Sequence, residues 1–539
     1  MKKFTVIVLF VVLLFTFSAC SLLNNTGGGQ GDGTTTPDSE ENYEFGDDIS
    51  YNNDKFYEDY SEEEKELYYT LWSEKTKINI QIDITPLELA KINEAMDDYT
   101  ANPRNTAKAD TYRKCNLTIT VNDTSYYYEE VGIRMRGNTS RRYFANSDGT
   151  IYDFVHFRFN LTETFDGEEY ENGAWGKEAY HDWSGDKAGR KARKNRSFAT
   201  MEKFYYKWNK NYDQTYIREV YANRMFQAYG ILAPHITLTQ IQLLQNGAME
   251  NLGVGGLYET IDKAFIKRNF DKSRKGGDLY KCSWGADFTS YSGKCGVETA
   301  THAYTYALKT NDDTTSEDYN NHEYLKAFID MLRNRQNTRG FKTKLEAMVD
   351  MNYFTRFEAV NYLLGNPDCI RNNCNNFYIY FVPVEGEDKS TSKAYIIPYD
   401  YDRCLGADVD WNPKEDSMVN AKPYDKNGSI ECNNPLYTKT ILNGGLAEYK
   451  AMYKSKIQQV LNGNWFKYET YKKLFNAYKA NYSSVAMPSE AIIAQCGNHI
   501  RMDRFVFSET ESSDINRSDV NLTVKLYMEQ KRHTATTSM

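Results

Sequence analysis

Two polar segments in the second half of the chain carry residue types that bind metal ions and phosphate groups. The first reads Asn366-Pro367-Asp368-Cys369-Ile370-Arg371-Asn372-Asn373-Cys374-Asn375-Asn376, and the second ends in Tyr399-Asp400-Tyr401-Asp402. Two strand-like apolar runs, 377–382 and 394–398, lie between them. Carboxylate and amide oxygens are the hard ligands that Mg²⁺ takes beside phosphates. An acid and several asparagines, followed by two more acids, therefore suit a magnesium–nucleotide site with one acid left for the nucleophile.

A third segment upstream combines a strand, a tight turn and several arginines. It reads Val131-Gly132-Ile133-Arg134-Met135-Arg136-Gly137-Asn138-Thr139-Ser140-Arg141-Arg142. The backbone N–H groups of a Gly-Asn turn can face an anion. Each arginine can hold two phosphate oxygens at once through two parallel N–H groups. Taken alone, the segment fits solvated surface arginines equally well.

Five segments together resemble the spore coat protein H (CotH) kinase-like family, in the family's order and over about residues 115 to 410. They are Val131–Arg142, Tyr216–Ala222, Gly255–Lys263, Asn366–Asn376 and Ile397–Asp402. The resemblance implies an α+β, two-lobed, atypical protein-kinase-like fold with a β-rich N-terminal lobe and an α-rich C-terminal lobe. It further implies transfer of the γ-phosphoryl group of ATP, with Mg²⁺ or Mn²⁺, to serine of secreted or envelope proteins.

The resemblance also assigns roles to the acidic residues. Asp368 would be the catalytic aspartate that accepts the proton of the substrate hydroxyl; the alternative is a turn residue after Pro367. Asp400 would bind the metal, with Asp402 as a second ligand or as the alternative one. Strand alternation would place both acids on the same side. Of Asn373 and Asn376, one is expected to help bind the metal.

The nucleotide-binding set implied by the resemblance is Arg134, Arg136, Arg158, Glu219 and Glu259. Glu219 would pair with a basic residue that touches the phosphates, or else form an ion pair with Arg218 or Arg224. Arg158 stands where the family tends to have lysine, and the two are not interchangeable. Glu259 falls where a hinge between the lobes is expected. The chain has no GxGxxG, HRD or DFG motif.

Hydrophobic patterns predict mostly strands early in the chain and mostly helices late. Strands are expected at 77–84, 116–121, 126–135, 153–160, 235–244 and 253–261. Helices are expected at 216–229, 322–334, 351–364 and within 440–510. This order is typical of a two-lobed enzyme.

The N-terminus predicts a bacterial lipoprotein. Lys2 and Lys3 precede an apolar run, 4–17, and Ser18-Ala19-Cys20 forms a cleavage site. We therefore expect a signal peptide at 1–19, acylation at Cys20 and an extracytoplasmic, membrane-anchored location; an ordinary secretory signal is the alternative. A flexible acidic tether is expected at 20–60, an α/β lead-in at 61–130, the kinase-like domain at 131–515 and an irregular tail at 516–539.

Composition limits the other functions. A net charge of −9 without a long basic block argues against nucleic acid as the main ligand. The spacing of the cysteines and histidines matches no zinc motif. Two further hypotheses stay open: a pseudokinase-like surface binding protein, and a surface glycan hydrolase with paired carboxylates. The sequence gives no indication of the oligomeric state.

Overall fold

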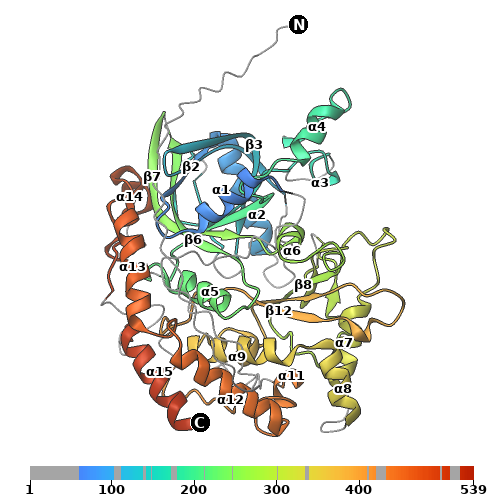
Figure 1. Ribbon diagram of the computed structural model, residues 1–539. Coiled ribbons are helices and arrows are strands. Elements are labelled where there is room, and N and C mark those ends of the chain that lie inside the picture. The colour runs from blue at the N-terminus through green and yellow to red at the C-terminus, as the bar shows by residue number, and fades with distance from the viewer. Residues whose placement is uncertain are drawn as a thin grey trace, which may run out of the picture. The chain divides into compact units, whose positions relative to one another are not determined.

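The structure is a computed structural model that describes most of the chain from Tyr60 onward (Figure 1). Within 60–539 the description omits 102–110, 138–140, 147, 172–178, 212, 246, 300–301, 334–338, 409–411, 421–432, 498–499 and 510–521. The expected signal peptide, Cys20 and nearly all of the tether lie outside the described residues, as does Asn138.

The first sheet is a barrel that closes, among the described residues, with seven strands in the order β1-β2-β3-β4-β5-β7-β6. These strands are β1 (Ile78–Asp83), β2 (Arg113–Val121), β3 (Thr124–Arg136), β4 (His156–Asn160), β5 (Lys203–Trp208), β6 (Ile236–Gln245) and β7 (Ala248–Glu259). The neighbouring pairs are antiparallel except β1 and β6, whose parallel pairing closes the barrel.

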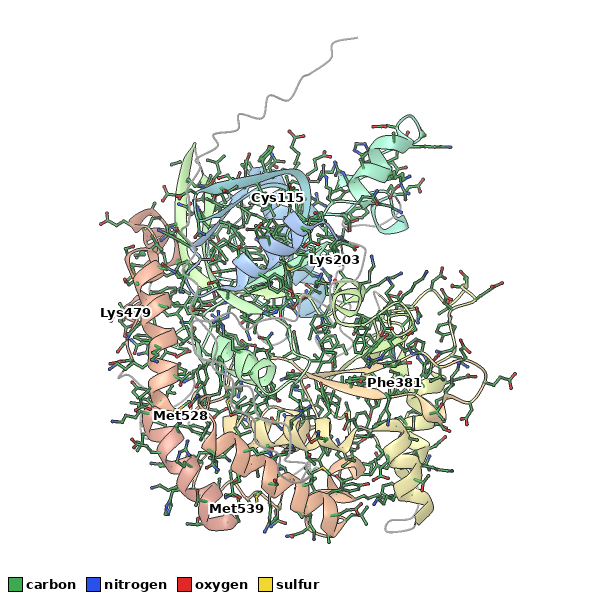
Figure 2. The ribbon with its side chains drawn as sticks, viewed as in Figure 1. Cys115, Lys203, Phe381, Lys479, Met528 and Met539 are labelled. Carbon is green, nitrogen blue, oxygen red and sulfur yellow. The ribbon has the colours of Figure 1, made fainter. Side chains whose placement is uncertain are left out.

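Alternation along β3, β4 and β5 separates an apolar interior from an outer face that carries arginines. Phe157 and Phe159 of β4 pack into the same core as Phe204 and Tyr206 of β5. The residues between them point the other way, because successive side chains of a strand face opposite sides. Arg134, Arg158 and Tyr205 are partners across β3, β4 and β5, so two arginines and a tyrosine lie side by side on the outside of the barrel. Figure 2 shows the side chains that fill the barrel around Cys115.

A second sheet and a set of helices form the rest of the molecule. The sheet has the order β12-β11-β8-β10-β9, with β8 (Asp278–Cys282), β9 (Cys295–Gly296), β10 (Tyr306–Leu308), β11 (Phe377–Phe381) and β12 (Ala394–Pro398). The helices are α1 (Glu62–Trp72), α2 (Pro86–Ala101), α3 (Glu168–Glu171), α4 (Lys187–Lys194), α5 (Arg218–Ala228), α6 (Lys263–Asn269), α7 (Glu323–Arg333), α8 (Arg339–Met348), α9 (Met351–Leu364), α10 (Ile370–Asn373), α11 (Pro435–Thr438), α12 (Ala447–Asn462), α13 (Tyr468–Tyr482), α14 (Glu490–Cys496) and α15 (Val524–Ser538). In Figure 1, α5 lies between the barrel at the top and α9 and α12 at the bottom.

The mixed α+β class and the order of strands before helices are confirmed. The irregular tail predicted at 516–539 is wrong for residues 524–538, which form α15. Thr523 caps this helix by accepting a hydrogen bond from the Leu526 N–H. Its buried residues, Val524, Tyr527, Met528, Lys531 and Ala535, recur at helical spacing. Lys531 interrupts the apolar pattern of this set, so hydrophobic periodicity alone does not predict the helix.

Within the described part of the chain, no helix combines the length and the apolar character that a membrane crossing needs.

The packing of α15 against the end of α9 can be tested at Gly365, the residue that ends α9. It has a left-handed φ of 61°, and a Cβ there would lie 1.8 Å from the Tyr527 hydroxyl oxygen. Gly386 also has a positive φ, 78°, but open space around it. Gly386→Ala is expected to lower the free energy of unfolding by about 1 kcal/mol. Gly365→Ala is expected to lower it by about 1–3 kcal/mol more, because the tyrosine must move.

Chemical denaturation of the two variants and the parent protein measures this difference. Equal losses at the two glycines would show that Tyr527 does not pack against Gly365.

Candidate functional site

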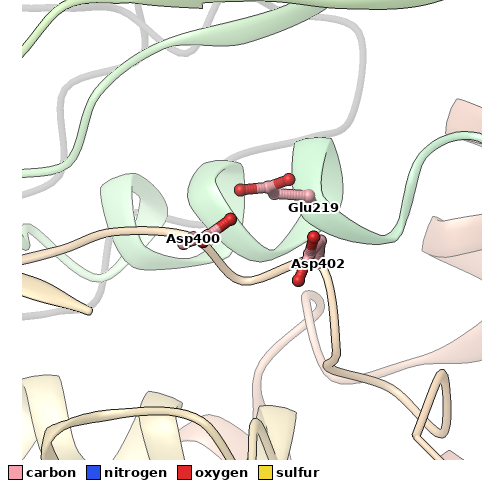
Figure 3. Close-up of side chains that lie close together, drawn as sticks. All are labelled: Glu219, Asp400 and Asp402. Atoms are coloured by element: carbon pink, nitrogen blue, oxygen red, sulfur yellow. The ribbon is translucent and has the colours of Figure 1, made fainter. Parts of the chain in front are cut away.

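The candidate site is built around one lysine that no sequence motif had marked. The Nζ atom of Lys207 on β5 lies 2.9 Å from Oε2 of Glu219, 2.5 Å from Oδ1 of Asp400 and 2.9 Å from Oδ2 of Asp402. Each of the three acids offers an oxygen within 4.8 Å of the others. Figure 3 shows Asp400 and Asp402 on a loop that passes beside Glu219 of α5. One ammonium among three carboxylates leaves the group formally negative, which suits a divalent cation.

Glu219 is fixed from two further sides. Its Oε2 accepts a hydrogen bond of 2.6 Å from the hydroxyl of Tyr258 on β7, and its Oε1 accepts one of 3.1 Å from the Tyr401 N–H. The alternative ion pairs expected for it do not form. Arg218 pairs with Asp213, and Arg224 pairs with Glu74.

Asp400 and Asp402 lie beyond the end of β12, so strand alternation is the wrong reason for their proximity. β12 ends at Pro398, and Asp400 has a left-handed φ of 62°. The loop nevertheless turns both carboxylates toward Lys207. Asp400 is the more exposed of the two, at 31% of its side chain against 13% for Asp402. A ligand entering from solvent would therefore meet Asp400 first.

Burial and charge shift the pKa values of the group in opposite directions. Burial, with help from the charges of Asp400 and Asp402, raises the pKa of Glu219. Burial would lower the pKa of Lys207, but the three carboxylates hold it well above its ordinary value. Burial would likewise raise the pKa of Asp402, yet the ammonium groups of Lys207 and Lys210 hold it well below its ordinary value. The lysine is thus charged, and the acid nearest both lysines is ionised.

Asp368 lies in a cradle of asparagine amides. Asn373 and Asn375 donate hydrogen bonds of 2.6 and 2.9 Å to its Oδ1, and Asn376 donates one of 2.9 Å to its Oδ2. Burial and the charge of Asp400 raise the pKa of Asp368, while the Asn375 and Asn373 amides act against this rise. In this arrangement Asn373 and Asn376 turn their NH₂ groups toward the acid, and their part in metal binding stays a prediction.

Asn366 connects the two acidic loops. Its side-chain oxygen accepts a hydrogen bond of 3.1 Å from the Asp368 N–H, and its NH₂ group donates one of 3.2 Å to the Asp400 carbonyl. The structure therefore brings Asp368 and the lysine-centred acids into one region through a single buried amide.

The predicted arginines lie on neighbouring strands of the barrel, and Arg136 contacts Tyr399, the residue before Asp400. The guanidinium carbon of Arg136 lies 3.3 Å from the ring centroid of Tyr205, and its NH₂ group donates a hydrogen bond of 2.5 Å to the Tyr399 hydroxyl. Arg134 lies 4.8 Å from the ring centroid of Tyr112. Arg158 stands between Arg134 and Tyr205 in the sheet register. The basic partner of Glu219 is Lys207 on β5, one strand later than Arg158 on β4.

Glu259 is not part of this group. It is fully buried, 2.7 Å from the Arg268 guanidinium, and accepts hydrogen bonds from Tyr68 and from the His235 N–H. All of these contacts are inside the protein, so the structure gives Glu259 a place in a buried ion pair rather than beside Lys207.

A comparison with known protein families places most of these residues in a family match. The family model of the CotH kinase protein matches residues 133–488. The chain belongs to the CotH kinase family. The matched range contains Lys207, Glu219 and both acidic loops, and it ends before α15 begins. A search of curated proteins found no match to the chain.

Sequence reasoning could have found Lys207 in this CotH kinase family member. Residues 203–208 read Lys-Phe-Tyr-Tyr-Lys-Trp, and aromatic residues favour strands. Asn209-Lys210-Asn211 then supplies a turn before the helix that carries Glu219. Alternation places Lys203, Tyr205 and Lys207 on one face, opposite the apolar barrel interior.

Replacing Lys207 by methionine is expected to strengthen Mn²⁺ binding by about tenfold or more in the absence of nucleotide, because the ammonium competes for the same oxygens. Electron paramagnetic resonance of free Mn²⁺ measures the affinity. The matched control is Lys210→Met, since Lys210 lies 3.6 Å from Asp402 and contacts that acid alone among the three.

The gain should vanish in Lys207→Met combined with Asp400→Asn. Equal affinities in the parent protein and in Lys207→Met would show that the three acids do not form a cation site.

Proposed function

We propose that this CotH kinase family member is an ATP-dependent protein kinase that phosphorylates serine on secreted or envelope proteins. The observation that carries the proposal is the lysine–glutamate pair of Lys207 and Glu219 next to two loop acids and an amide-held aspartate. These are the parts that phosphoryl transfer needs: a cation for the phosphates, acids for a metal and a base for the hydroxyl. The family match supports the kinase class.

The residues present fit a Mg²⁺ or Mn²⁺ ion. Three carboxylates supply oxygens within 4.8 Å of one another, and hard oxygen ligands suit both ions. Asp400 and Asp402 would hold the ion, because Glu219 also has Tyr258 and the Tyr401 N–H as fixed partners. Bound there with ATP, the metal would neutralise charge on the phosphate oxygens.

Asp368 is suited to receive the proton of a serine hydroxyl. Its Oδ1 already accepts two amide hydrogen bonds, whereas its Oδ2 accepts only that of Asn376 among the hydrogen bonds described. Oδ2 therefore has capacity for one more donor. Burial raises the pKa of Asp368, which increases its basicity. The three amides would hold this carboxylate in one orientation while it receives the proton.

Lys207, Arg136 and Arg158 would bind the phosphates of ATP from the barrel side. Arg136 is held by Tyr205 and Tyr399, so its guanidinium has a defined orientation before ligand binding. Lys207 would exchange part of its contact with the acids for a phosphate oxygen. In this proposal the barrel acts as the N-terminal lobe and the helical region as the C-terminal lobe of a kinase-like fold.

The expected location follows from the N-terminal sequence alone. Residues 1–19 have the pattern of a lipoprotein signal, and Cys20 would carry the lipid anchor. Acyl chains on Cys20 and the following tether would hold the kinase near the membrane surface, within reach of secreted and envelope proteins. Nucleic acid is not proposed as a partner.

A weakly active or inactive surface binding protein is the second candidate. One observation favours it: the Lys207 ammonium contacts all three acids at once and so occupies oxygens that a metal would use. A glycan hydrolase fits less well. Its two catalytic carboxylates have different roles and lie about 5–9 Å apart, whereas the three acids here offer oxygens within 4.8 Å of one another.

The test is incubation of the protein with γ-labelled ATP and Mg²⁺ or Mn²⁺, followed by counting of label in the protein and in serine-rich peptides. Asp368→Asn is expected to lower transfer by about 100-fold or more, because the base is lost while an amide of the same shape remains. Asp400→Ala is expected to abolish transfer.

The matched control is Asp350→Asn. Asp350 caps α9 by accepting hydrogen bonds from two backbone N–H groups, and asparagine caps helices equally well. This variant should keep its activity. Undiminished transfer in Asp368→Asn would refute the base assignment, and absence of both transfer and nucleotide binding in the parent protein would favour the binding protein.

A further inference from the structure

The C-terminal helix α15 lies outside the family match, yet it contacts the backbone behind both acidic loops. It packs beside α9, α12 and α13. In Figure 2 it is the helix that carries Met528 and precedes Met539. Two of its buried residues, Tyr527 and Lys531, make polar contacts with the segments that flank Asp368 and Asp402.

Tyr527 contacts the end of α9, from which the Asp368 loop starts. Its hydroxyl donates a hydrogen bond of 3.1 Å to the Leu363 carbonyl. The last carbonyls of a helix lack partners within that helix, so an outside donor fixes the helix end. The next carbonyl, that of Leu364, accepts a hydrogen bond of 2.8 Å from the Leu405 N–H. The tyrosine and the loop that follows Asp402 thus bind adjacent groups of the same helix end.

Two glycines make room for this tyrosine. Gly365 and Gly406 both have positive φ angles, and a Cβ at Gly406 would lie 3.2 Å from the Cβ of Tyr527. Gly365 precedes Asp368 by three residues, and Gly406 follows Asp402 by four. The ring therefore lies against the start of one acidic loop and the end of the other.

Lys531 supplies a second connection. It is fully buried, forms an ion pair with Asp416, and lies 3.6 Å from the ring centroid of Tyr362 on α9. The Tyr362 hydroxyl donates a hydrogen bond of 3.1 Å to the Asp416 carbonyl. Removal of either partner would leave the other charge buried without a counter-ion, so the pair holds α15 and Asp416 together.

Arg371 carries this connection to the Asp368 loop. It lies three residues after Asp368, and its guanidinium donates hydrogen bonds of 2.6 and 3.0 Å to the carbonyls of Ser417 and Met418. The same side chain pairs with Glu358 of α9 at 2.7 Å. Asp416, held by Lys531, directly precedes the two residues that Arg371 binds.

We propose that α15 is a positioning element for the phosphoryl-transfer site, acting through Tyr527 and Lys531 on the loops that carry Asp368 and Asp400. The expected effect of α15 on the reaction rate rests on the proposed function, whereas its effect on the positions of the loops does not. If α15 were displaced, the site residues of the barrel would keep their positions, and the two acidic loops would lose their fixed positions relative to each other.

The test compares full-chain Lys531→Met and Tyr527→Phe with the parent protein in steady-state phosphoryl transfer, thermal unfolding and amide hydrogen exchange. Lys531→Met is expected to lower kcat by about tenfold or more, because small shifts of catalytic groups have large effects on rate. The KM for ATP should change by less than about threefold, since the phosphate-binding side chains lie on the barrel. Amides of 366–373 and 404–408 should exchange faster, and those of β4 and β5 should not.

Arg113→Met is the matched control. Arg113 is a buried cation paired with Glu88 at 2.7 Å, and it belongs to β2 of the barrel, which carries neither acidic loop. It should lower the unfolding temperature and keep kcat. If Arg113→Met lowers kcat as much as Lys531→Met at a similar loss of stability, or if exchange in Lys531→Met rises only within α15, the proposal is overturned.

Tyr527→Phe keeps the test decisive if Lys531→Met does not fold. It removes only the hydroxyl, and faster exchange at 363–368 with a lower kcat supports the proposal, while unchanged exchange and kcat overturn it. If the parent protein transfers no phosphate, the proposed function fails, and the exchange of 366–373 and 404–408 still decides whether α15 positions the loops.

Discussion

The site depends on one electrostatic constraint: three carboxylates are held within 4.8 Å of one another in a largely buried place. Like charges at this separation repel strongly when water is scarce, so the arrangement needs a cation. Lys207 supplies it from the barrel, while the acids come from α5 and from the loop after β12. The ammonium therefore ties the barrel to the rest of the molecule as well as balancing the acids.

The acidic loops in turn depend on helix ends and left-handed residues. Gly365 ends α9 with a φ of 61°, and Cys374, Asn376 and Asp400 also have positive φ angles although they are not glycines. Such residues are strained unless several contacts hold them. Here the amide cradle of Asp368, the Asn366 bridge and the tyrosine of α15 provide these contacts. Positive φ angles also occur outside these segments, at Ala199, Thr200 and Tyr216 among others, so it is the contacts named here that tie the strained residues of the acidic segments to the site.

The sequence predicted the parts of the site that are local and missed those that depend on distant pairing. The acids of 366–402 were found because their residue types and order are visible in one segment. Closure of the barrel was not predicted, because β1 pairs with β6 about 160 residues later in the chain and no local pattern encodes that pairing. Residues 203–208 could have been predicted as a strand with Lys207 on its outer face, but the contact of Lys207 with Glu219 appears only when β5 lies beside α5. Glu259 was misplaced because a short motif does not show that its side chain faces Arg268.

Under the proposed function, the position of Lys207 also sets the order in which the site is completed. Its ammonium fills the space among the acids, so a cation alone must displace it from three contacts, whereas an anion with phosphate oxygens offers the lysine a new partner. Metal and nucleotide then favour each other, since each relieves the charge that the other leaves unbalanced. A cation that enters without nucleotide gains little, because the acids are already neutralised in part. The same contact that stabilises the empty site thus restrains it until both ligands are present.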